Sequence, residues 1–162
     1  MKCEKTKVLL MTNDNMDMLQ RIFTMQTELN DHVFGKNRLV DDQGGQLTMA
    51  AIFNEVAAGA LKVNDLPNRW LANYARAMRE ELHELDADLL WKWWSKDEIN
   101  LQNIRVELID ILHFLVSAMI CAGLTPDKVY DIYRQKHAVN LNRQNSGYSR
   151  NSKTEDDNRD IR

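Results

Sequence analysis

The chain has few residues that break helices. Only two prolines and six glycines occur among its 162 residues, and no segment sustains the polar–apolar alternation of a half-buried strand. Apolar residues recur every three to four positions instead, which is the helical period. The sequence therefore predicts an all-α fold, a bundle of about five helices with a four-helix core.

Cysteine, excess basic charge and uninterrupted apolar runs are also scarce. The two cysteines, Cys3 and Cys121, fit neither a CxxC metal site nor a disulfide framework, which favours a reducing, cytoplasmic setting. A net charge of −3 argues against a nucleic-acid binder that relies on phosphate neutralisation. The longest apolar stretch, residues 106–124, contains two acids and a histidine, so we expect a buried helix and no membrane span.

Capping residues indicate where the helices begin and end. Pro67 suits a first helical turn, as does Pro126 with Thr125 before it as N-cap. Ser95 and Glu98 have capping-box spacing and predict a helix restart near residue 97. Residues 1–148 should form one domain, and the tail over 149–162 should be disordered because it has little to bury. The expected helices span 15–34, 46–61, 67–90, 102–122 and 126–144.

The helix expected over 102–122 is apolar nearly all round, which is typical of a central element. Its polar exceptions, Glu107, Asp110, His113 and Ser117, fall within an arc of about 120°. Buried carboxylates without partners are costly. This stripe is therefore expected to face a cation.

The preceding helix repeats the pattern. Glu81 interrupts an apolar stripe, and Glu84 lies one turn further along the same side. A single acid pair at this spacing is typical of a solvated face, whereas two pairs on apolar stripes indicate converging carboxylates. Oxygen ligands in that number suit Mg²⁺, with Mn²⁺ as a substitute. The predicted metal ligands are Glu81, Glu84, Glu107 and Asp110.

Other polar residues indicate which ligand such a metal would help to bind. Lys136, Asn140 and Arg143 lie within about 60° on one helix face, an arrangement suited to anions. Gln26 lies in an apolar stripe with Asn30 one turn later, and a buried amide must find partners. A helix–helix hydrogen bond or the edge of a nucleobase would satisfy it.

Three classes of function fit these patterns. The first is a Mg²⁺-dependent enzyme that acts on a nucleotide. The second is a di-iron carboxylate bundle, since Glu80/His83 and Asp110/His113 have acid-x-x-His spacing, although it needs more glutamates than the other helices supply. The third is a binding module without chemistry, which leaves the buried acids unexplained.

Several segments together resemble a known family. "EELHEL…LWKWW", "VELIDILHF" and "YRQKHAVNLNRQNSGY" are similar to the all-α dimeric dUTPases and the phage-type dCTP/dUTP pyrophosphatases, within the MazG-like superfamily of nucleotide pyrophosphohydrolases. "MQTELND" is similar to the first motif of that family. The resemblance implies hydrolysis of a pyrimidine deoxynucleoside triphosphate, dUTP first, to the monophosphate and pyrophosphate. The alternative is a dCTP or broader-specificity enzyme, and a homodimer whose sites combine residues of neighbouring subunits is expected.

The resemblance also implies roles for individual residues. One of the two glutamates at 81 and 84, with Glu81 favoured, would orient the attacking water. Trp93 and Trp94 are assigned to packing, and Asp86 and Asp88 are expected to meet water. The implied phosphate-binding residues are Lys92, Lys136, Arg143 and Tyr148, and the implied base- or sugar-binding residues are Gln26, Asn30, Trp91, His113, Phe114 and Asn140.

Two departures from the family pattern bear on which base the enzyme would prefer. The segment over 35–66 separates the first motif widely from the acids, and the link from Ser117 to Pro126 is short. Both features are closer to the phage-type enzymes. They leave the choice between uracil and cytosine open, because an amide can flip to serve either base.

Overall fold

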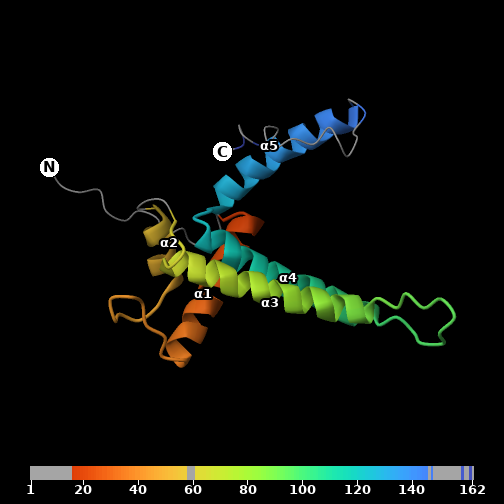
Figure 1. Ribbon diagram of the computed structural model, residues 1–162, viewed down its shortest axis with the longest axis horizontal. Helices are drawn as coiled ribbons and strands as arrows, with labels where there is room; N and C mark the ends of the chain where they lie inside the picture. The colour runs from red at the N-terminus through yellow and green to blue at the C-terminus, as the bar shows by residue number, and fades with distance from the viewer. Residues whose placement is uncertain (1–15, 58–60, 146, 148–157, 159–160, 162) are drawn as a thin grey trace. The chain divides into compact units, whose positions relative to one another are not determined.

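The chain folds into helices joined by loops (Figure 1), and its computed structural model describes residues 16–57, 61–145, 147, 158 and 161. The all-α prediction is confirmed, since the β-pairing among the described residues is an isolated bridge between Val40 and Gln46. The expected disordered tail lies outside the described residues apart from 158 and 161. The helices are α1 (Met18–Lys36), α2 (Met49–Ala57), α3 (Leu66–Asp88), α4 (Leu101–Cys121) and α5 (Pro126–Asn145).

The chain forms two compact units. The first, Met1–Gly123, contains α1 to α4, and the second, Leu124–Arg162, contains α5. Among the described residues, no single helix is long and apolar enough to cross a membrane; α4 and α5 pass only when taken together, by length and composition.

Local capping explains most helix starts. The Asp17 side chain accepts from the Gln20 backbone N–H at 2.8 Å and closes a capping box before α1. Thr125 accepts from the Lys128 N–H at 3.3 Å before α5, as predicted. The predicted restart at Ser95 is wrong: Asn100 caps α4 instead, because its side chain accepts from the Asn103 N–H at 3.1 Å.

The core of the first unit lies where α1 and α2 meet the start of α3 and the end of α4. Gly123 ends α4 as predicted, with a φ of 74° that favours glycine. A Cβ there would lie 2.8 Å from Cγ1 of Val56, so the close approach of α2 also requires glycine. Burial raises the pKa of the Cys121 thiol to about 12, so this cysteine packs as a small apolar residue. The fully buried side chains are Phe34, Leu47, Met49, Ile52, Pro67, Val116, Ser117 and Cys121.

Helices α3 and α4 run side by side as an antiparallel hairpin that extends beyond this core (Figure 1). The expectation that α4 is buried nearly all round is wrong for its first half, where Leu108 and Ile109 are each more than half exposed. Among the described residues of the first unit, α4 makes most of its helix contacts with α3, which leaves this outer apolar face exposed. On α1, Leu29 and Val33 are likewise exposed.

Candidate functional site

Three carboxylates converge between α3 and α4. One oxygen each of Glu81, Glu84 and Glu107 lies within 4.8 Å of the other two. Glu81 and Glu84 are one turn apart on α3 and face Glu107 across the hairpin. We call these three residues the acid cluster, and it joins residues that the sequence predicted to meet.

Asp110 adds its charge to this cluster from one turn along α4. Burial, followed by the charges of Glu84, Asp110 and Glu107, raises the pKa of Glu81 above its ordinary value. Burial, Glu84 and Asp110 likewise raise the pKa of Glu107, while its contact with the Glu81 carboxyl opposes the rise. Crowding of like charges between α3 and α4 thus favours the protonated form of both glutamates.

Glu107 is the buried carboxylate of the cluster. It is only 8% exposed, and its Oε2 atom is buried without a hydrogen-bond donor among the described residues. Its Oε1 atom accepts from Asn103 Nδ2 at 3.4 Å, and the same amide also donates to Asp88. An orphaned carboxylate oxygen among other acids fits a bound divalent cation, and the all-oxygen donor set suits Mg²⁺ or Mn²⁺.

A second polar group crosses between α1 and α4. Gln26 Nε2 donates to Asn30 Oδ1 at 3.1 Å and to Ser117 Oγ at 3.0 Å, and Asn30 Nδ2 donates to Ser117 Oγ at 2.9 Å. The Gln26 Oε1 atom bonds His113 Nδ1. We call these four residues the amide network. The sequence left two possible partners for the Gln26 amide, a neighbouring helix or a nucleobase. The structure shows the hydrogen bond between helices.

The amide network lies toward the core side of the acid cluster. Residues Glu107 and His113 are six positions apart on α4, which corresponds to about 9 Å along the axis. The Phe114 ring packs against Tyr74, with ring centroids 6.3 Å apart. Burial raises the pKa of Tyr74 far above its ordinary value, so its hydroxyl stays neutral. The network and the Phe114 ring thus form a half-buried surface next to the acids.

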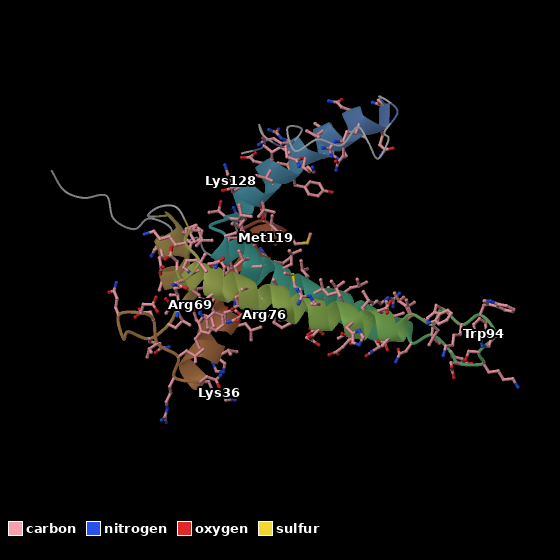
Figure 2. The ribbon with its side chains drawn as sticks, in the orientation of Figure 1. Lys36, Arg69, Arg76, Trp94, Met119 and Lys128 are labelled. Atoms are coloured by element: carbon pink, nitrogen blue, oxygen red, sulfur yellow. The ribbon has the colours of Figure 1, made fainter. Side chains whose placement is uncertain are left out.

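The predicted tryptophan and lysine lie at the opposite end of the hairpin. The loop between α3 and α4 carries Trp94 beyond the helix ends (Figure 2). Trp91 is 73% exposed, and the Lys92 Nζ atom lies 5.8 Å from its ring centroid. Because Trp91 follows the end of α3, the acid cluster lies between it and Gln26. One chain therefore does not bring Trp91 and the amide network together.

The packing role expected for the other two tryptophans is wrong as far as the core is concerned. Trp93 is 88% and Trp94 59% exposed, and each makes an edge contact with a neighbouring indole instead. Among the described residues, the ring contacts of this loop join Trp94 to Trp91 and to Trp93.

The remaining predicted phosphate- and base-binding residues belong to the second unit. Lys136 is half-buried and donates to Asn158, Asn140 is exposed, and Arg143 is half-buried. Tyr148 lies outside the described residues. The two units are compact by themselves, so the prediction that α5 serves the acid cluster stays a prediction.

Sequence reasoning missed three residues of the site. Asn103 lies four residues before Glu107, and Asp88 lies four residues after Glu84, so the same-face spacing could have found both. Asp88 was expected to meet water, but it is half-buried and accepts from Asn103. Ser117 was noted in the polar stripe without a role, yet it joins both amides of α1.

Comparisons with known proteins agree with this site. The dCTP pyrophosphatase of Enterobacteria phage T4 is 24% identical over 109 residues, which cover 67% of this chain and 56% of that protein. The dCTP pyrophosphatase of Enterobacteria phage LZ5 is 28% identical over 104 residues, which cover 49% of this chain and 60% of that protein. The chain thus spans less than two thirds of the length of these two relatives. No solved structure matches the chain.

A match to a family model assigns the chain to a protein family. The model described as dUTPase matches residues 18–125, which include the acid cluster, the amide network and the tryptophan loop but not α5. This match covers well over half of the chain. The chain therefore belongs to the dUTPase family of all-α proteins.

Proposed function

We propose that this protein is a Mg²⁺-dependent nucleoside triphosphate pyrophosphohydrolase that converts dUTP to dUMP and pyrophosphate. The observation that carries the proposal is the acid cluster, in which a buried oxygen of Glu107 beside Glu81 and Glu84 has no hydrogen-bond donor in the part of the chain that the structure describes. Family membership and the activity named for the two phage relatives support the same chemistry.

All four acids would bind the metal, and Glu81 would have a second role. Glu81, Glu84, Glu107 and Asp110 would hold Mg²⁺, for which Mn²⁺ could substitute. When bound, Mg²⁺ would neutralise phosphate oxygens and lower the pKa of a coordinated water. Glu81, which faces both Glu84 and Glu107, would orient the attacking water and accept its proton. The bond between the α- and β-phosphates breaks, and pyrophosphate leaves.

The amide network would read the pyrimidine. Gln26, Asn30 and His113 present amide and imidazole groups next to the acids, and Phe114 offers a ring face. Lys136, Arg143 and Asn140 enter through their shared helix face and the resemblance, and Tyr148 through the resemblance, as phosphate and base contacts. The activity named for the two phage relatives makes dCTP the second candidate substrate, together with a broader pyrimidine specificity.

We include a homodimer in the proposal. The outer faces of the α3–α4 hairpin expose Leu82, Leu108 and Ile109, each by more than half. A second copy of the hairpin would bury these faces. It would also allow Trp91 and Lys92 of one copy to reach the amide network of the other, which they do not reach within one chain.

The di-iron alternative gains no support from the site. Glu80 and His83 are both exposed, and the metal-compatible cluster found among the described residues contains no histidine. Iron analysis of the purified protein tests this alternative directly, and stoichiometric iron would favour it.

The decisive experiment is incubation with each deoxynucleoside triphosphate, with and without Mg²⁺, followed by product identification. We expect dUMP and pyrophosphate in equal amounts from dUTP, only when Mg²⁺ is present. Release of inorganic phosphate as the first product would overturn the reaction. Faster turnover of dCTP would leave the reaction intact and change the base.

A further inference from the structure

The hydroxyl of Ser117 makes three hydrogen bonds, two of which join α1 to α4. Ser117 is fully buried, and its hydroxyl donates to the carbonyl of His113 at 2.9 Å. Its oxygen accepts from Gln26 Nε2 at 3.0 Å and from Asn30 Nδ2 at 2.9 Å. A serine hydroxyl offers one donor and two acceptor positions. Because its proton is committed to α4 itself, both amides of α1 must turn their NH₂ groups toward it.

This arrangement fixes the remaining atoms of both amides. With Nε2 of Gln26 shared between Ser117 and Asn30, its Oε1 atom must point to His113. An acceptor there requires the imidazole to carry its proton on Nδ1, which leaves Nε2 of the neutral ring as an acceptor. His113 is exposed whereas Ser117 is buried. The amide orientation fixed by Ser117 in the interior therefore determines which imidazole nitrogen of His113 carries the proton at the surface.

We propose that Ser117 is a positioning residue that locks the donor and acceptor order of the base-reading edge. It acts through Gln26, Asn30 and His113 and does not touch the substrate. The inference rests on the proposed function, since it makes the amide network the reader of a pyrimidine. Uracil and cytosine present opposite hydrogen-bonding groups at position 4 and N3, so a network that cannot flip its amides matches one of them in a given pose.

The hydrogen bonds within the network determine which donors and acceptors remain available to a ligand. The second N–H of Asn30 Nδ2 is the one amide proton of the network without a partner among these four residues. Each amide oxygen retains one further lone pair. Without the Ser117 hydroxyl, Gln26 and Asn30 could rotate by 180° and exchange these donors and acceptors. Specificity between the two pyrimidines would then relax.

The first test reads the His113 tautomer and needs no substrate. In ¹⁵N-labelled protein, at a pH where imidazole is neutral, long-range ¹H–¹⁵N correlations should show the proton of His113 on Nδ1. The resonance is assigned by its loss in His113→Gln. We expect Ser117→Ala to give a mixture of tautomers or a majority with the proton on Nε2. Retention of the Nδ1–H form in Ser117→Ala would overturn the positioning role.

The second test measures base choice. The ratio of kcat/KM for dUTP and dCTP should move toward unity by about tenfold in Ser117→Ala, the size expected for one well-formed hydrogen bond to a substrate. A changed tautomer with an unchanged ratio would remove the specificity role. If the wild-type chain hydrolyses neither nucleotide, the proposed function fails, whereas the tautomer still decides whether Ser117 positions the network.

Two further variants separate positioning from simple packing. Thr27→Val is the matched control, because the Thr27 hydroxyl makes the same bond to the carbonyl four residues earlier, at 2.9 Å, and bonds no other helix among the described residues. It should leave tautomer and ratio unchanged, and an equal effect there would count against Ser117. Ser117→Thr, which keeps the hydroxyl, should retain the wild-type tautomer. If Ser117→Ala fails to fold, Ser117→Cys provides the same comparison with a weak acceptor of similar size.

Discussion

At the scale of residues, the site consists of carboxylates that repel one another, and the proposed cation would relieve that repulsion. Glu84 contributes to the raised pKa values of both Glu81 and Glu107, which places its charge at the centre of the cluster. Removing that charge should take away a ligand without disturbing the fold, since the Glu84 side chain is exposed.

We therefore expect Glu84→Gln to lower kcat for dUTP hydrolysis by at least about a hundredfold, the order of effect of losing a group that stabilises transition-state charge. Asp110→Asn should act in the same direction. Glu80→Gln, an exposed neighbour outside the cluster, serves as the matched control and should stay near wild type. Circular dichroism checks the fold of each variant. Activity retained in Glu84→Gln would remove this residue from the metal site.

The raised pKa values also predict how stability depends on pH. Since Glu81 and Glu107 bind a proton more tightly in the folded chain, they stabilise it fully below the ordinary value of 4.5. That contribution is lost as the pH rises through their raised folded-state pKa values. In metal-free buffer, the free energy of unfolding should fall as the pH rises above 4.5 and through the raised pKa values, and less steeply in Glu107→Gln. Urea unfolding at several pH values in chelator measures both slopes, and parallel curves would contradict the assignment.

At the scale of elements, the sequence predicted helices well because their signals are local. Capping by Thr125, the glycine after α4 and the proline in the first turn of α3 all act within a few residues. The paired acids were found because their spacing on each helix is itself local. Which apolar faces are covered depends on tertiary neighbours, so the exposure of Leu29 on α1 and Leu108 on α4 could not be read from periodicity.

The tryptophans show the same limit. Trp70 and Trp93 are chemically equal in the sequence, yet Trp70 packs between Phe34 and Tyr74, with ring centroids 4.7 and 5.7 Å away, while Trp93 lies on an exposed loop. We expect Trp70→Ala to lower the free energy of unfolding by about 3 kcal/mol. Trp93→Ala should change it by less than about 0.5 kcal/mol. Urea denaturation compares the two, and equal losses would mean that the loop packs on a surface that one chain does not provide.

At the scale of the whole molecule, the exposed apolar face of the hairpin leads us to expect a homodimer. We expect light scattering to give twice the 18.9 kDa mass of the chain. Introducing charge into the exposed apolar face with Leu108→Asp and Ile109→Asp should yield a monomer. Val63→Asp, at an exposed position outside the hairpin, is the matched control and should remain dimeric. A wild-type monomer would remove the homodimer from the proposal, together with the idea that Trp91 serves a second copy.

The most direct measurement concerns the acid cluster itself. Mn²⁺ titrated into the metal-free protein and followed by the electron paramagnetic resonance of the free ion reports binding without any substrate. The wild-type protein and Glu80→Gln should bind Mn²⁺ saturably with similar affinity, and Glu107→Gln should bind at least about tenfold more weakly, because it loses the buried carboxylate whose oxygen lacks a partner. Equal binding by the wild-type protein and Glu107→Gln, or no binding by either, would contradict a metal site between α3 and α4.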